Sequence, residues 1–307
     1  MVIALSIIGG LVALAIGGEL LVRGAVGISL RAGLSTLVTG VVIVGAATSM
    51  PEMVASVQAA MIGSPEIAWG NIVGSNIANT LLILGATALI APIVLSGAGM
   101  RDAVSGLAAV ALLWALGLAG VGAVWIGVAL LGLLAAYVYW RVRHPSPAHD
   151  LEEEEASAPG SLLLAIVLFV IGVALLIIGG KYLVDGAIAL ARIFSISETV
   201  IGLTIVAVGT SLPELAASVA AALKGRAGLA LGNVVGSNIF NLLLIGGATM
   251  VVTPLPIPAD LMDFEWPVLA ATAVLLVLLC RFAGVIGRGL GAVLVLAFAA
   301  NTVLLFA

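Results

Sequence analysis

The sequence predicts an all-α polytopic membrane protein in which ten transmembrane helices form two inverted five-helix repeats. Hydrophobic residues make up 63% of the 307 residues and charged residues only 8%, and the mean hydropathy is +1.34. A soluble domain is about 25% charged, so this composition indicates an integral membrane protein. The other two observations are a series of long apolar segments and an internal sequence repeat.

Breaks in the hydrophobic pattern divide the chain into ten segments, each close to the roughly 20 apolar residues that a transmembrane helix needs. Most segments are separated by short turn signals such as Gly63-Ser64-Pro65. The first segment lacks a basic region before it and is longer than a signal-peptide core, so we interpret it as a span. We expect spans at residues 2–30, 36–62, 66–91, 102–119, 122–141, 161–190, 197–223, 227–252, 265–281 and 287–306.

The connection between the fifth and sixth segments is unlike the others. Its sequence, RHPSPAHDLEEEEASAPG at 143–160, is polar and acidic and contains proline. A run of like charges such as Glu152–Glu155 is typical of a solvated linker, although it could also attract cations weakly. We therefore predict a first repeat at 1–142, an acidic linker at 143–160 and a second repeat at 161–307.

The two repeats align at an offset of 162 residues, without a gap from about residue 10 to residue 85. This offset places Pro51 on Pro213 and Glu52 on Glu214. Because each half has five spans, an odd number, the second half enters the membrane in the opposite sense. Such inverted repeats are typical of secondary transporters, whose ion site lies between the repeats near the middle of the membrane.

Basic residues predict the orientation, because cytoplasmic loops carry an excess of Lys and Arg. With the N-terminus outside, only Arg192 falls clearly on the outer side. We therefore place both termini outside the cell membrane and the linker in the cytoplasm. The cytoplasmic side then carries Arg31, Arg101, Arg141, Arg143, Lys224, Arg226, Arg281 and Arg288.

Two proline-containing runs interrupt the second and seventh spans, GAATSMPEMVAS at 45–56 and AVGTSLPELAAS at 207–218. Proline removes a backbone donor and clashes with the carbonyl four residues earlier, so we expect free carbonyls near Gly45 and Ala207. Irregular backbone persists at membrane depth only where it lines a cavity or is buried in protein. Each break is flanked by two hydroxyls and a carboxylate, which are Thr48, Ser49 and Glu52 in one repeat and Thr210, Ser211 and Glu214 in the other.

The third and eighth spans each contribute a serine and an asparagine four residues apart, on one helix face. These residues are Ser75 with Asn79 and Ser237 with Asn241. Four such helices meeting at a pseudo-twofold axis would offer oxygen ligands, which suit Ca²⁺ or Na⁺ better than zinc or copper. Both histidines lie in the linker and Cys280 is the single cysteine, so we expect neither a cofactor nor enzymatic chemistry.

Other polar residues have simpler interpretations, because polar side chains in membrane helices often serve packing alone. A carboxylate beside a repeated proline break is not explained in this way, since charges inside a membrane are costly. We expect the remaining asparagines to bond to backbone groups around the glycines: Asn71, Asn76, Asn233 and Asn238. We interpret two pairs of opposite charges, each four residues apart, as intrahelical ion pairs: Glu19 with Arg23 and Lys181 with Asp185.

The motifs TSMPE with GSNIAN and TSLPE with GSNIFN resemble the two α-repeats of the sodium/calcium exchanger family, within the Ca²⁺/cation antiporter superfamily. The resemblance covers the chain length, the ten spans, the linker and both repeats. The glutamates of the two PE motifs are the central cation ligands in that family, which implies this role for Glu52 and Glu214. It also implies gating by sliding of the first and sixth spans, and further oxygen ligands from Thr48, Ser49, Thr210, Ser211, Ser75 and Ser237 and from carbonyls near Gly45 and Ala207.

Two positions depart from the family pattern. Ala47 stands where the second repeat has Gly209, which would stiffen one helix break. Asn241 stands where many prokaryotic relatives and the potassium-dependent branch have Asp. The linker is also too short for the large Ca²⁺-sensing domains of animal exchangers.

The expected function is antiport of Na⁺ and Ca²⁺ by alternating access, with three Na⁺ per Ca²⁺ and no requirement for K⁺. The expected partners are the two ions and the lipid bilayer, without nucleic acid or an obligatory protein partner. A proton/Ca²⁺ antiporter using the same glutamates is the nearest alternative. A Ca²⁺-selective channel would need a continuous pore, and an intramembrane enzyme would need a nucleophile with a base or a metal.

Overall fold

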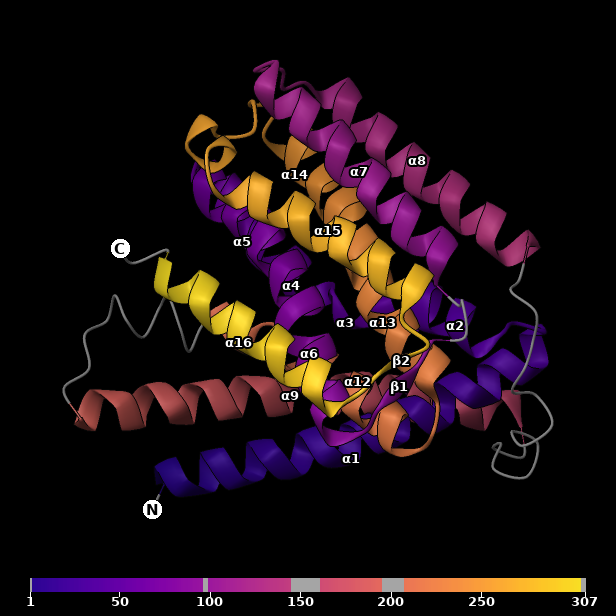
Figure 1. The fold of residues 1–307 in the computed structure, drawn as a ribbon. Helices are drawn as coiled ribbons and strands as arrows, with labels where there is room; N and C mark the ends of the chain where they lie inside the picture. Colours follow the sequence, from indigo (N-terminus) through magenta and orange to yellow (C-terminus); the bar gives the residue numbers. More distant parts are fainter. Residues whose placement is uncertain (1, 96–98, 145–160, 195–206, 305–307) are drawn as a thin grey trace.

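The computed structural model describes residues 2–95, 99–144, 161–194 and 207–304, and the chain in these ranges is almost entirely helical (Figure 1). Residues 145–160 of the predicted linker and the start of the predicted seventh span at 197–206 lie outside the described residues. The described part of every predicted span is mostly helical, because a long apolar run can satisfy its backbone hydrogen bonds internally only as a helix.

The first half contains five helical stretches, two of which are interrupted. They are α1 (Val2–Ala32); α2 (Thr36–Thr39) with the π-helical η1 (Gly40–Val44), α3 (Gly45–Thr48) and α4 (Met50–Met61); α5 (Pro65–Ala78) with the π-helical η2 (Asn79–Ile83) and α6 (Leu84–Ile90); α7 (Met100–Leu118); and α8 (Val124–Arg143).

The second half follows the same order. Its elements are α9 (Leu162–Ile193); α11 (Ala207–Gly209) and α12 (Leu212–Leu223); α13 (Ala227–Phe240) with the π-helical η5 (Asn241–Ile245) and α14 (Gly246–Val252); the short 3₁₀-helix η6 (Ala259–Met262); α15 (Glu265–Phe282); and α16 (Arg288–Leu304). Two short strands that the sequence did not predict, β1 (Ile93–Val94) and β2 (Val285–Ile286), pair antiparallel.

Seven of the described helices are long and apolar enough to cross a membrane, and the bent pair Thr36–Thr48 and Met50–Met61 makes up to eight. The helices α12 and α16 are apolar but shorter. The predicted class, a helical protein embedded in a membrane, is therefore confirmed. In the stretches Pro65–Ile90 and Ala227–Val252, 78% of an 18-residue apolar window is buried within the protein, and these stretches form its centre.

The long helices α1 and α9 lie side by side and antiparallel, beneath the bundle formed by the other helices in Figure 1. Glycines make this close approach possible. A methyl group added at Gly10 would come within 2.7 Å of the Leu183 backbone nitrogen, and one at Gly17 within 3.0 Å of the Gly172 carbonyl oxygen. The two helices therefore pack backbone against backbone.

The two ends of the bundle differ in charge. Gly228 lies against Thr36 and β1 pairs with β2, which places several helix ends together on one side. On the opposite side the Thr253 hydroxyl donates to the Ala60 carbonyl at 2.9 Å. The first side, the basic end, carries Arg31, Arg101, Arg141, Arg143, Lys224, Arg226, Arg281 and Arg288, and the opposite side, the acidic end, carries Glu66, Asp260, Asp263 and Glu265.

A buried ion pair joins two helices at the basic end. Arg141 of α8 contacts Asp102 of α7 with Nε–Oδ1 at 2.6 Å, and both side chains are almost fully buried. The Tyr137 hydroxyl donates to the same carboxylate at 2.7 Å, and Arg141 Nη1 also donates to the His144 carbonyl. This cluster fixes the start of α7 to the end of α8.

Candidate functional site

Two helix breaks bring the glutamates of the PE motifs into the centre of the protein. The helix bends by 45° where α3 ends and α4 begins at Ser49. The matching break between α11 and α12 lies at Ser211. A proline occupies the first turn after each break, and Glu52 and Glu214 follow it, each only 1% exposed.

Each serine at a break contacts the glutamate of the other repeat. The Ser211 hydroxyl donates to Glu52 Oε1 at 3.2 Å, and the Ser49 hydroxyl donates to Glu214 Oε1 at 3.5 Å. Each serine stands three residues before the glutamate of its own repeat, a spacing that in an unbroken helix would put the two on one face. The contact across the repeats arises because each serine stands at the break itself, facing the opposite helix.

A second group of hydroxyls links α3 to α13. Thr48 Oγ1 lies 3.1 Å from Asn233 Oδ1 and 3.5 Å from the Ser237 hydroxyl. The Ser237 hydroxyl donates to the Gly45 carbonyl at 3.4 Å, and that carbonyl also accepts from the Ser49 amide. The Gly45 carbonyl is therefore hydrogen-bonded rather than free, and its role as an ion ligand stays a prediction.

Asn79 and Asn241 each begin a π-helical segment, η2 and η5, and each is 1% exposed. Single π turns interrupt helices frequently at functional sites. Oδ1 of both asparagines and Oε2 of both glutamates are buried without a hydrogen-bond partner in the described structure. Four of the predicted ligands thus keep an oxygen available.

For the other predicted ligands, the structure gives only their location and burial. Ser75 is buried on α5, one turn before Asn79. Thr210 is half-buried in the break between α11 and α12. Ala207 is the first residue of α11, and its side chain lies outside the described part of the structure. Their roles as ligands stay predictions.

Two asparagines brace the glutamate helices in the same way in both repeats. Asn71 Nδ2 donates to the Glu52 carbonyl at 3.3 Å and to the Ser56 hydroxyl at 2.9 Å. Asn233 Nδ2 donates to the Glu214 carbonyl at 3.1 Å and to the Ser218 hydroxyl at 2.9 Å. Bonds to backbone were expected, but around glycines rather than at the glutamates themselves.

The remaining two asparagines differ from each other. Asn76 Nδ2 donates to the Ile72 carbonyl one turn earlier, at 2.7 Å, as expected of a backbone-bonded asparagine. Among the described residues, Asn238 bonds only to side chains, those of Asn79 and Thr80. The expectation of a backbone bond is therefore wrong for Asn238.

The predicted charge pairs on the long helices also differ. Arg23 Nε lies 2.6 Å from Glu19 Oε1, which confirms the first pair. Lys181 and Asp185 do not pair within the described ranges, so the second prediction is wrong. Glu19 Oε1 also lies 2.6 Å from Lys224 Nζ, a contact between α1 and the end of α12 that sequence spacing could not indicate.

The donor set at the centre fits a hard cation. It contains two carboxylates, two amides and several hydroxyls, all oxygen ligands of the kind that Ca²⁺ prefers. The ion pairs among the described residues involve Glu19 and Asp102, so Glu52 and Glu214 have no Lys or Arg partner there. Two buried carboxylates without a counter-ion are costly, and a bound cation removes that cost.

Comparison with known proteins agrees with this geometry. The family model of the sodium/calcium exchanger protein matches residues 2–143 and 164–307. The chain is 38% identical over 318 residues to CaxA of Alkalimonas amylolytica, covering 100% of this chain and 99% of that one. It is 32% identical to the sodium/calcium exchanger MaX1 of Methanosarcina acetivorans, covering 97% and 96% of the two chains.

A solved structure of the sodium-calcium exchanger NCX_Mj, soaked with zero Na⁺ and Ca²⁺, matches with a TM-score of 0.85. The sequence identity is 32%, and the match covers 99% of each chain. The chain therefore belongs to the sodium/calcium exchanger family, and it is a membrane antiporter of cations and Ca²⁺ rather than an enzyme.

Proposed function

We propose that this antiporter exchanges Na⁺ for Ca²⁺ at one shared site centred on Glu52 and Glu214. Ca²⁺ and Na⁺ compete for the same oxygens, and occupancy by either ion permits the change of access. The further ligands are Thr48, Ser49, Thr210, Ser211, Ser75, Ser237, Asn79 and Asn241, with backbone carbonyls near Gly45 and Ala207.

The observation that carries the proposal is the set of four buried oxygens without partners among the described residues, one each on Glu52, Glu214, Asn79 and Asn241. Buried polar atoms are normally hydrogen-bonded, and unpaired ones cost about 1–3 kcal/mol each. Such oxygens on two carboxylates and two amides are what a weakly held, exchangeable cation requires. The names of MaX1 and NCX_Mj support Na⁺ and Ca²⁺ as these ions.

The architecture that suits this function is ten spans in two inverted repeats, 1–142 and 161–307, joined by an acidic linker at 143–160. The matched breaks at Ser49 and Ser211 and the reciprocal serine–glutamate bonds support a pseudo-twofold relation. The charge difference between the two ends supports a cytoplasmic basic end, with both termini outside the cell membrane.

Alternating access follows from the cost of moving charge. Closing the protein around an empty site would bury two charged carboxylates away from water, which costs free energy. A bound cation neutralises the carboxylates and removes this cost. The pair α1 and α9 would slide across the remaining helices as the gate, since it packs on them as a separate layer (Figure 1). The ions thereby shift an equilibrium between two existing states.

The ion requirements follow from the neutral side chain at position 241. An asparagine offers an oxygen without adding a third charge, so the site has no need of K⁺. Two Na⁺ would match Ca²⁺ in charge at a site of charge −2, and the family resemblance favours a third, which makes the cycle electrogenic. Uptake should then depend on membrane voltage.

A second candidate is proton/Ca²⁺ antiport through the same residues. It is favoured by one observation, that the two carboxylates have no basic partner among the described side chains. Protons could neutralise them as Na⁺ does. The two mechanisms differ only in the ion that replaces Ca²⁺.

Uptake of ⁴⁵Ca²⁺ into proteoliposomes tests the proposal. The vesicles are loaded with Na⁺, with K⁺ or with acid, and uptake is followed at a clamped potential of either sign. The proposal expects uptake with Na⁺ inside alone, sensitive to voltage and indifferent to K⁺. Uptake driven by acid without Na⁺ would instead establish the proton antiporter, and an absolute K⁺ requirement would contradict the role given to Asn241.

A further inference from the structure

The amide of Asn79 is held by one of its two ends only. Its Nδ2 donates to Asn238 Oδ1 at 3.1 Å, whereas its Oδ1 has no partner within the described structure. The side chain is 1% exposed, so water from outside does not reach it freely. The segment η2, which Asn79 begins, packs against α12, the helix that carries Glu214.

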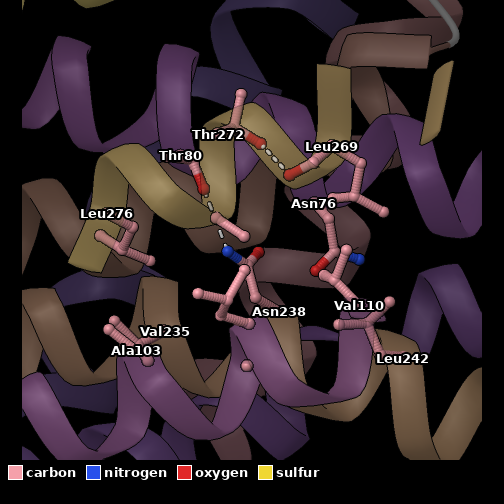
Figure 2. A pocket seen from close by; sticks show the side chains of 13 residues that line it. Asn76, Thr80, Ala103, Val110, Val235, Asn238, Leu242, Leu269, Thr272 and Leu276 are labelled. Atoms are coloured by element: carbon pink, nitrogen blue, oxygen red, sulfur yellow. Dashed lines mark hydrogen bonds between the residues drawn. The ribbon is translucent and has the colours of Figure 1, made fainter. Parts of the chain in front are cut away.

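Asn238 is itself fixed in place. Its Nδ2 donates to the Thr80 hydroxyl at 3.1 Å, as the dashed line in Figure 2 shows. It lies on α13 beside a cavity of about 10 Å³ that is lined mostly by apolar side chains such as Leu242 and Leu276. A cavity of this size holds about one water molecule, so it is too small for a hydrated cation.

The chemistry of an amide makes its orientation decisive. One end of the group is a donor and the other an acceptor, and only the oxygen can bind a cation. By accepting a hydrogen bond from the nitrogen of Asn79, Asn238 leaves the oxygen of Asn79 free. We infer that Asn238 is a positioning residue, which turns the Asn79 oxygen toward the cation without binding the cation itself. This inference rests on the proposed function.

The other repeat provides a natural comparison. The offset of 162 residues places Asn79 on Asn241 and Asn76 on Asn238. Asn76 donates to its own helix, its Oδ1 has no partner, and both polar atoms of Asn241 also lack partners among the described residues. The positioning bond is therefore present on one side of the site only, and Asn76 supplies a matched control beside the same cavity.

The test replaces Asn238 with leucine, which has a similar volume and suits an apolar setting. We expect the Asn238→Leu exchanger to show a KM for Ca²⁺ raised about tenfold, the effect of one lost buried hydrogen bond. The maximal rate and the thermal midpoint in detergent should stay near those of the wild type. Asn76→Leu should change the KM by less than about twofold, since it touches no ligand.

A second variant separates positioning from structure. In an Asn79→Asp background both ends of the side chain are oxygens, so its orientation no longer matters. Adding Asn238→Leu to this background should then leave the KM unchanged. An unaltered KM in Asn238→Leu alone, or the full tenfold loss when Asn238→Leu is combined with Asn79→Asp, would overturn the inference.

The Ca²⁺ dissociation constant of the purified proteins gives the same comparison independently of transport. If Asn238→Leu does not fold, Asn238→Ala is measured instead, with the same expected weakening of about tenfold. A wild type that binds Ca²⁺ without exchanging it for Na⁺ would contradict the proposed function, while binding would still decide the role of Asn238.

Discussion

The helices α1 and α9 are counterparts in the two repeats, but they pack differently on the helices that carry the glutamates. A methyl group added at Gly18 of α1 would come within 3.0 Å of both the Ala216 carbonyl oxygen and Ala220 Cβ on α12. The nearest neighbours of Gly180, its counterpart on α9, are 3.8 Å away and also belong to α12. On α4 there is instead a cavity of about 340 Å³, lined by Met50, Pro51, Val54, Ala55, Gln58 and, from α9, Ile177.

The repeat explains where this cavity lies. At the offset of 162 residues, Ala216 and Ala220 correspond to Val54 and Gln58, which both line the cavity. The cavity therefore occupies the place in one half that a tight helix contact occupies in the other. Because α4 runs to the acidic end and α12 to the basic end, the tight contact lies toward the basic end and the cavity toward the acidic end.

Side-chain size accounts for the difference. Alanine allows the backbone approach that Gly18 makes, whereas valine and glutamine keep a facing helix at a distance. The four central helices, by contrast, exchange the same serine–glutamate and asparagine–carbonyl bonds in both halves. Central bonds that recur in both halves, combined with unequal packing of α1 and α9, are what a carrier open to one side at a time requires.

The largest effect is expected from replacing the glutamates, which the two halves share. Glu52→Gln and Glu214→Gln should each lower Na⁺-driven Ca²⁺ uptake at least about a hundredfold, because breaking a buried charge arrangement costs about 3–5 kcal/mol. Glu66→Gln, a glutamate at the acidic end away from the two breaks, is the control and should leave uptake unchanged. Near-normal exchange by a well-folded Glu214→Gln protein would remove the proposed site.

The second prediction concerns a variant that makes the contact of α1 with α12 resemble that of α9 with α4. Ala220→Gln gives α12 the side chain that α4 has at this position, and overpacking of this kind costs about 1–3 kcal/mol. We expect the tight side to open and the cavity on α4 to close. A single cysteine introduced as Val54→Cys reports this, since its labelling by an impermeant maleimide should fall when Ala220→Gln is added.

The matched control for this variant is Gln58→Ala, which removes bulk from the side that is already open. Because position 54 still carries a side chain larger than alanine, the cavity on α4 should persist, the α1–α12 contact should stay in place and the labelling of position 54 should remain high. Labelling that does not change with Ala220→Gln would mean that the packing of α1 on α12 does not govern access from the other side.

A smaller effect is expected from the ion pair between Glu19 and Lys224. The pair joins α1 to the end of α12 at 2.6 Å, but both side chains are partly exposed. Such pairs contribute about 0.2–1 kcal/mol, so Lys224→Gln should shift the ratio of the two states by no more than about fivefold. The same labelling assay measures it at low salt and high salt, where screening should erase the difference. Arg23→Gln, which leaves Glu19 paired with Lys224, should shift it less.

The smallest effect concerns the linker. If residues 143–160 only connect the repeats, replacing Glu152–Glu155 with serine should leave the apparent Ca²⁺ affinity of transport unchanged. Transport kinetics at varied Ca²⁺ on the linker side of the membrane would check this. A several-fold loss of affinity would make the run a regulatory or recruiting site.

The sequence predicts the helical segments well, and it indicates candidate site residues, for physical reasons. Apolar runs and turn residues determine where helices begin and end, and a glutamate beside a membrane proline has few explanations other than function. The repeat then indicates that the two motifs meet. Glu52 and Glu214 therefore stand out in the sequence alone, and the structure buries both, while their role as ion ligands stays a prediction.

Other features carry no sequence signal. The π turns at Asn79 and Asn241 occur in runs that suit an ordinary α-helix equally well. The pairing of Arg141 with Asp102 joins residues far apart in the chain. The asymmetry between α1 and α9 depends on which residues of α4 and α12 face them, and the repeat alone does not show that Ala216 and Ala220 meet Gly18.

Competition between the two ions at one site tests the central claim most directly. Purified protein in detergent is equilibrated with ⁴⁵Ca²⁺ while Na⁺ is raised in place of choline, and the same titration is made with Glu214→Gln. We predict that Na⁺ displaces Ca²⁺ completely from the wild type, with a Hill coefficient above one, and that Glu214→Gln binds little Ca²⁺ at any Na⁺ concentration. Ca²⁺ that stays bound at saturating Na⁺, or that Glu214→Gln binds as tightly as the wild type, would contradict a shared site.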